Sequence, residues 1–92
     1  NKDELIVANA GDSRCILCRS GSALPLTFDH KPDLPSEMNR IAKAGGKIQD
    51  GRVNGGLNLT RALGDLEFKS NVNLPREAQL IIDQPDIQKT NL

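Results

Sequence analysis

Residues 7–21, VANAGDSRCILCRSG, decide the fold, because one apolar run ends there in a polar turn and another begins at once. Gly11 and Ser13 are ordinary turn residues, and a turn needs no carboxylate beside them. Asp12 is therefore either a simple turn former or a metal ligand held at the end of a strand. The residues on either side give the context for both interpretations.

Apolar runs around this turn predict short strands. Leu5–Ala8 is apolar at every position, which is typical of a strand covered on both faces. CILCR at 15–19 and ALPLTF at 23–28 follow, separated by Ser-Gly-Ser, so we expect the first three strands to form an antiparallel meander. Pro25 has no amide hydrogen to donate, which places the third strand at a sheet edge.

The pattern changes to helical spacing within residues 29–46, DHKPDLPSEMNRIAKAGG. Asp33 or a near neighbour is expected to cap this short amphipathic helix, and Gly45 suits its left-handed C-terminal position. The residues predicted on one face are Met38, Ile41, Ala42 and Gly45. The glycine-rich residues 47–56, KIQDGRVNGG, then predict a tight hairpin or a mobile loop.

The rest of the chain predicts a strand over 57–63, a turn or single helical turn over 73–78, and one or two strands within 79–92. Arg61 stands out because alternation places its guanidinium on one face with leucines. A buried guanidinium needs a carboxylate or an anionic ligand, although an Arg at a strand end can also reach solvent. The leucines are Leu57, Leu59 and Leu63, and the candidate carboxylates are Asp12, Asp29 and Asp65.

Length and composition limit the fold and the partners. A chain of 92 residues forms at most one domain, and with aromatic residues at 2% its core is thin, so we expect a piece of something larger. Twelve basic and twelve acidic residues give zero net charge, which argues against nucleic acid or an anionic membrane as a partner. No apolar run is long enough to span a membrane.

Cys15 and Cys18 form a Cys-x-x-Cys pair in a predicted strand. Three residues apart, their Cα atoms lie on the order of 10 Å from each other, beyond the reach of a disulfide. The sequence offers no second Cys or His pair for a tetrahedral zinc site. Two reduced thiols and a reducing compartment are therefore expected.

Five motifs occur in an order that resembles the metal-dependent protein phosphatases of type 2C, the PPM family. They are VANAGDSRCILCRSG, DHKPD, a helix ending in AGG, GRVNGGLNLTRALGD and QLIIDQPDI. The resemblance implies an α+β fold in which residues 1–92 form part of an antiparallel β-sandwich with a short helix and a glycine-rich flap. It also implies hydrolysis of phosphoserine and phosphothreonine in proteins with Mg²⁺ or Mn²⁺, and a cytoplasmic or nuclear location.

The resemblance assigns roles to individual residues. Asp12 matches the family aspartate that helps to bind an additional metal ion, and Mg²⁺ and Mn²⁺ do prefer oxygen ligands. Arg61 and Asp65 are expected to support the active site. Residues 32–54 match the flap, a helix-and-loop insertion that helps to choose substrates. The flap residues expected to matter are Gly45, Gly46, Asp50, Arg52 and Asn54.

The departures from the family pattern also carry predictions. The Asp-Gly-His-Gly, Asp-Gly-x-Trp-Asp and Asp-Asn motifs that supply most metal ligands do not occur in these residues, so the isolated chain is expected to be inactive. His30 lies in DHKP, outside the motif of the family's general acid, and a structural role is expected for it. Thr60 replaces a commoner Ser and keeps the hydroxyl. The alternatives are a phosphatase-like regulatory module without catalytic metals and a small β-rich interaction domain.

Overall fold

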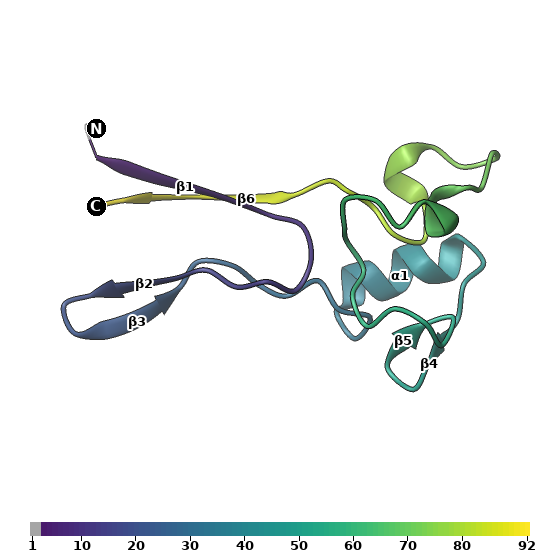
Figure 1. The fold of residues 1–92 in the computed structure, drawn as a ribbon, viewed down its shortest axis with the longest axis horizontal. Coiled ribbons are helices and arrows are strands. Elements are labelled where there is room, and N and C mark those ends of the chain that lie inside the picture. Colours follow the sequence, from purple (N-terminus) through teal and green to yellow (C-terminus); the bar gives the residue numbers. More distant parts are fainter. Residues whose placement is uncertain (1–2) are drawn as a thin grey trace.

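The computed structural model describes residues 3–92, which form an elongated molecule of 45 × 26 × 20 Å. Figure 1 shows two arms of paired strands extending from a lobe that contains the helix α1 (Pro35–Lys43). One arm pairs β1 (Glu4–Asn9) with β6 (Asp86–Asn91), so that the two ends of the described chain lie side by side. The other arm is the hairpin of β2 (Ile16–Arg19) and β3 (Ser22–Pro25).

The β2–β3 hairpin confirms the second half of the predicted meander, but the first half is wrong, because β1 pairs with β6 and not with β2. The backbone between β1 and β2 is instead hydrogen-bonded to residues 27–30. The Gly11 carbonyl accepts a hydrogen bond from the His30 amide at 2.9 Å, and the Cys15 amide donates to the Thr27 hydroxyl at 3.0 Å. These bonds hold the Asp12 turn against residues 27–30.

β1 is covered on one face only, contrary to the prediction for Leu5–Ala8. Burial alternates along the strand, and Ile6 is 57% exposed. The reason is that β1 lies in a two-stranded sheet, and nothing in residues 3–92 covers the second face.

α1 begins after Leu34, whose side chain makes no capping hydrogen bond, so the prediction of Asp33 as the cap is wrong. Pro35 starts the helix with a φ already suited to it. Gly45, at φ +86°, ends the helix as predicted. The buried face contains Glu37 and Ile41, whereas the predicted Met38 and Ala42 are exposed.

The hydrophobic core lies in the lobe, where Ile41, Val53 and Ile81 are buried together. Val53 comes from the hairpin of β4 (Ile48–Gln49) and β5 (Arg52–Val53), which confirms the tight hairpin predicted in this glycine-rich stretch. Half-buried apolar residues complete the core: Ile48, Leu57, Ala62, Phe68 and Leu80.

The predicted strand over 57–63 is absent from the structure of the described residues, which has only isolated bridges at Leu57 and Arg61. The backbone bonds of this segment go to different partners, since Thr60 donates to His30 and Ala62 donates to Ile82. The short 3₁₀ helices η1 (Leu66–Lys69) and η2 (Arg76–Ala78) follow, and η2 confirms the helical turn expected over 73–78. Of the strands expected within 79–92, β6 is present, and 79–83 contributes a single bridge at Ile82.

The three antiparallel strand pairs and one α-helix found in residues 3–92 agree with the predicted α+β class. In residues 3–92 we find no helix with the length and apolar character needed to cross a membrane.

Candidate functional site

Asp12 lies in a bend between the end of β1 and the start of β2. Figure 1 shows that the segment between these strands joins the two arms of the molecule. Its side chain is 28% exposed, and its Oδ2 is 3.7 Å from the ammonium of Lys31. Gly11 before it adopts φ +133°, and a Cβ at this position would lie 2.9 Å from the carbonyl oxygen of Arg61. Only glycine fits this close approach, so the bend that presents Asp12 requires Gly11.

His30 holds the same bend from the other side. It is 1% exposed, and its Nδ1 accepts a hydrogen bond from the Gly11 amide at 3.0 Å. An Nδ1 that accepts carries no proton, so the ring hydrogen is on Nε2, which donates to Asp86 Oδ2 at 2.7 Å. This geometry agrees with the structural role expected for His30.

Arg61 is paired with carboxylates, as its burial demanded, but the predicted partners are wrong. Its Nε and Nη2 donate to both oxygens of Glu37 at 3.0 Å, and its Nη1 donates to Asp86 Oδ1 at 3.1 Å. The three predicted aspartates are held elsewhere or lie at the surface: Asp12 faces Lys31, Asp29 is paired with Arg14, and Asp65 is exposed before η1. Leu63 is 82% exposed, so the predicted leucine face does not form either.

Glu37 is the centre of a buried polar cluster. It is 1% exposed and also accepts hydrogen bonds from Arg40 at 3.0 Å and from the Thr60 hydroxyl at 2.8 Å. Burial raises the pKa of Glu37, but the hydrogen bonds from Arg61, Thr60 and Arg40 outweigh it and lower that pKa to about 2. Glu37 is therefore a carboxylate at neutral pH. Thr60 makes its bond to Glu37 through the hydroxyl group that Thr and Ser share.

Asp86 connects this cluster to His30. The hydrogen bond from His30 lowers the pKa of Asp86, partial burial opposes that shift, and the nearby charge of Arg61 lowers the pKa further. The connection runs from the Gly11 amide to α1 through hydrogen bonds alone. We call the side chains of His30, Asp86, Arg61 and Glu37 the polar relay.

The residues predicted for the flap are spread over α1's end and the β4–β5 hairpin. Gly46 is tightly packed, since a Cβ there would lie 2.4 Å from Leu80 Cδ2. Asp50 and Asn54 adopt left-handed backbone conformations, at φ +54° and +49°. Arg52 donates to the Gly56 carbonyl at 2.9 Å. No hydrogen bond or ion pair within residues 3–92 joins these flap residues or Asp65 to Asp12.

Sequence reasoning missed Glu37, Arg40 and Asp86. A signal for the first two was present, because Glu37, Arg40 and the apolar Ile41 share one helix face at spacings of three and four residues. Asp86 carried no such signal, since it comes from a strand far along the chain.

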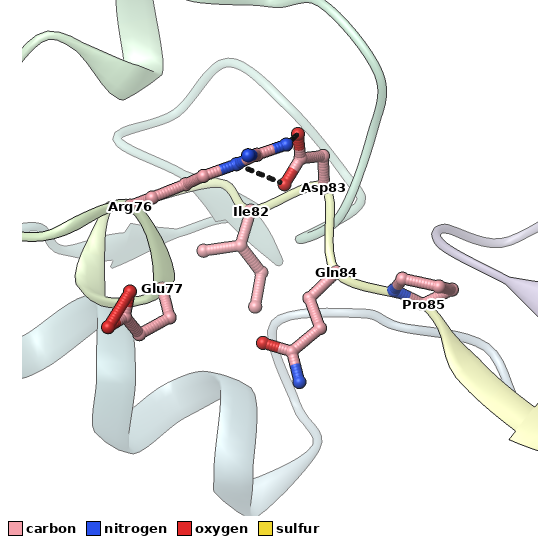
Figure 2. A pocket seen from close by; sticks show the side chains of 6 residues that line it. All are labelled: Arg76, Glu77, Ile82, Asp83, Gln84 and Pro85. Atoms are coloured by element: carbon pink, nitrogen blue, oxygen red, sulfur yellow. Dashed lines mark hydrogen bonds and ion pairs between the residues drawn. The ribbon is translucent and has the colours of Figure 1, made fainter.

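Metal-ligating groups do not gather within the part of the chain that the structure describes, where no three His, Cys, Asp or Glu side chains could hold one ion. Cys15 and Cys18 are both free thiols. A cavity of about 320 Å³ lies beside η2, and none of the predicted site residues lines it. Figure 2 shows Arg76 of this cavity paired with Asp83.

The profile of the family described as "Protein phosphatase 2C" matches residues 1–92. The chain belongs to the protein phosphatase 2C family. The rice protein named "Probable protein phosphatase 2C 11" is 57% identical over 90 residues, which are 98% of this chain and 25% of that protein. "Protein phosphatase 2C 1" of Paramecium tetraurelia is 57% identical over 91 residues, or 99% of this chain and 30% of the relative.

A solved structure supports the same assignment. The crystal structure of a phosphatase from Toxoplasma gondii matches this protein phosphatase 2C chain with a TM-score of 0.90 and 46% identity. The match covers 94% of this chain and 27% of the other. The chain thus spans between a quarter and a third of the length of these phosphatase 2C relatives.

Proposed function

We propose that this protein phosphatase 2C segment supplies part of the active centre of a phosphatase that hydrolyses phosphoserine and phosphothreonine in proteins with Mg²⁺ or Mn²⁺. The observation that carries the proposal is the placement of Asp12, whose carboxylate is presented to solvent from a bend held rigid by Gly11 and His30. The family match supplies the reaction class.

Asp12 fits a divalent cation as one ligand of a larger set. A carboxylate is a hard oxygen donor, and this one is partly exposed, with the Lys31 ammonium 3.7 Å from its Oδ2. In residues 3–92 no further acidic or His groups converge on it, so the other ligands come from elsewhere in the protein. When bound, the metal ion supplies an activated water and neutralises charge on the phosphoryl group.

The other residues of the chain position the substrate and the ligand. Residues 32–54 form a flap in which the end of α1 and the β4–β5 hairpin place Gly45, Gly46, Asp50, Arg52 and Asn54 beside the substrate. Arg61 fixes this flap to the strand that carries Asp86, because it binds both Glu37 and Asp86. Asp65 lies directly before η1. The free thiols of Cys15 and Cys18 suit the reducing cytoplasm or nucleus.

The test is metal-dependent turnover in the full-length protein. Replacing Asp12 by Ala removes an oxygen ligand, so we expect turnover of a phosphopeptide with Mn²⁺ to fall by about 10-fold or more. The exposed Glu67→Ala, outside the flap and the assigned site residues, serves as the control and leaves turnover unchanged. An unaltered Mn²⁺ response in Asp12→Ala contradicts the proposal. Tight phosphopeptide binding by the wild type without turnover identifies a regulatory module instead.

A further inference from the structure

We propose that His30 is a positioning residue for Asp12, and that the polar relay fixes its ring in the one tautomer able to do this. This inference rests on the proposed metal-binding role of Asp12. It adds a residue that acts on the metal ligand through the backbone, without touching the metal or the substrate.

The first step is the bond between His30 and the bend. The Gly11 amide is buried and donates to His30 Nδ1 at 3.0 Å, while the Gly11 carbonyl accepts from the His30 amide at 2.9 Å. Gly11 is thus hydrogen-bonded to His30 through both its amide and its carbonyl, one residue before Asp12. A buried amide that loses its acceptor is costly, so the bend would move if Nδ1 were removed.

The second step is the choice of tautomer. Nδ1 accepts only while the ring proton stays on Nε2, and Asp86 Oδ2 accepts the hydrogen bond from Nε2 at an N–O distance of 2.7 Å. Asp86 is itself held through Oδ1 by Arg61, whose guanidinium is anchored on the buried Glu37. A carboxylate that accepts from one ring nitrogen fixes the tautomer and orientation of an imidazole, as it also does for histidines that bind metals.

The third step is the contact of the Arg61 backbone with the bend. The Arg61 carbonyl oxygen lies against Gly11, where a Cβ would come within 2.9 Å of it. Arg61 therefore contacts the bend through its backbone and holds Asp86 through its side chain. The bend is confined between His30 and Arg61, and both residues belong to the same network.

Two substitutions at residue 30 separate positioning from mere packing. In His30→Asn the amide oxygen takes the place of Nδ1 and can still accept from Gly11, but the shorter side chain does not reach Asp86. In His30→Gln the amide nitrogen takes the place of Nε2 and can still donate to Asp86, but no acceptor remains for Gly11. Both variants lose the ring, so a purely structural role predicts similar effects in the two.

In the experiment, Mn²⁺ is titrated into the full-length protein and its binding is measured by calorimetry. The quantity compared is the dissociation constant of the binding step that Asp12→Asn removes. We expect His30→Gln to raise the dissociation constant of that step about 10-fold, and His30→Asn to raise it less than about 3-fold. Equal dissociation constants in the two variants, with Asp12→Asn still weakening Mn²⁺ binding, overturn the role of His30 alone. An unchanged affinity in Asp12→Asn overturns the proposed function together with this role.

A second measurement needs neither metal nor a variant. In the metal-free, ¹⁵N-labelled wild type, we expect a scalar coupling between the Gly11 amide nitrogen and His30 Nδ1, and an Nδ1 resonance typical of an unprotonated ring nitrogen. A protonated Nδ1, or no coupling, overturns the proposal even if both variants fail to fold.

Discussion

At the scale of single residues, stability depends strongly on Glu37, a buried carboxylate that contacts two guanidinium groups. Replacing it by Gln keeps the shape but removes the charge and sets amide hydrogens against Arg61. We expect Glu37→Gln to lower the free energy of unfolding by about 3 kcal/mol, measured by urea denaturation of the chain. The exposed Glu67→Gln is the control and changes it by less than about 0.5 kcal/mol. Equal stability of the two variants would show that the cluster contributes nothing net.

The same carboxylate gives the stability a pH dependence. The pKa of Glu37 is lowered from 4.5 to about 2 in the folded chain, so its contribution is complete above the unfolded pKa and disappears as the pH falls from 4.5 towards 2. We expect the urea midpoint to drop on acidification through this window. The drop is smaller in Glu37→Gln, and the remaining slope comes in part from the lowered pKa of Asp86. Identical pH profiles for wild type and variant would refute this assignment.

Gly11 and Gly21 allow a matched comparison of backbone strain with steric contact. Both have positive φ, but a Cβ at Gly21 meets nothing within 4 Å, whereas one at Gly11 meets the Arg61 carbonyl. Gly21→Ala is expected to cost about 1 kcal/mol of unfolding free energy, and Gly11→Ala clearly more, about 2 to 3 kcal/mol. Thermal or urea denaturation decides between them. Equal costs would mean that the Arg61 backbone moves away freely.

At the scale of elements, α1 begins without a capping side chain because Leu34 occupies the cap position. An Asp there would accept a hydrogen bond from a free amide of the first turn. Its negative charge would also interact favourably with the positive end of the helix dipole. We expect Leu34→Asp to raise the free energy of unfolding by about 1 kcal/mol relative to Leu34→Ala, which has no such oxygen. A Leu34→Asp variant no more stable than Leu34→Ala would argue against the helix start at Pro35.

The packing of residues 32–54 bears on how ordered this segment is. Its glycines and prolines favour a segment less ordered than the strands, yet it contributes Ile41 and Val53 to the core, while β1 has one exposed face. The Val53 amide donates to the Leu57 carbonyl at 2.7 Å. In hydrogen exchange we therefore expect Val53 to be protected at least as well as residues 5–8, and Gly51 in the hairpin turn to exchange fast. Slower exchange of residues 5–8 than of Val53 would show that residues 32–54 are less ordered than β1.

At the scale of the whole molecule, residues 3–92 present Asp12 as the candidate metal ligand and two strand arms that are largely exposed. The isolated 92-residue polypeptide is therefore expected to release no phosphate from a phosphopeptide above the blank, even with millimolar Mn²⁺. Under the proposed function, the full-length protein is expected to supply the remaining ligands and to be active in the same assay. Robust turnover by the isolated chain would show that Asp12 is assigned wrongly.

Local sequence alone determined the elements whose hydrogen bonds join residues that are close in the sequence. The β2–β3 and β4–β5 hairpins, the end of α1 at Gly45 and the turn at η2 are set by turn residues that leave the backbone few choices. It also showed that Arg61 needs a carboxylate, because a half-buried guanidinium cannot remain unpaired.

Only the tertiary structure decided which partners meet. β1 pairs with β6, Arg61 pairs with Glu37 and Asp86, and His30 holds Gly11. These choices join segments 19 to more than 80 residues apart, where every candidate carboxylate or strand offers similar local chemistry. Packing selects among them, because one arrangement buries Ile41, Val53 and Ile81 while leaving no buried side-chain polar atom in the described residues unsatisfied.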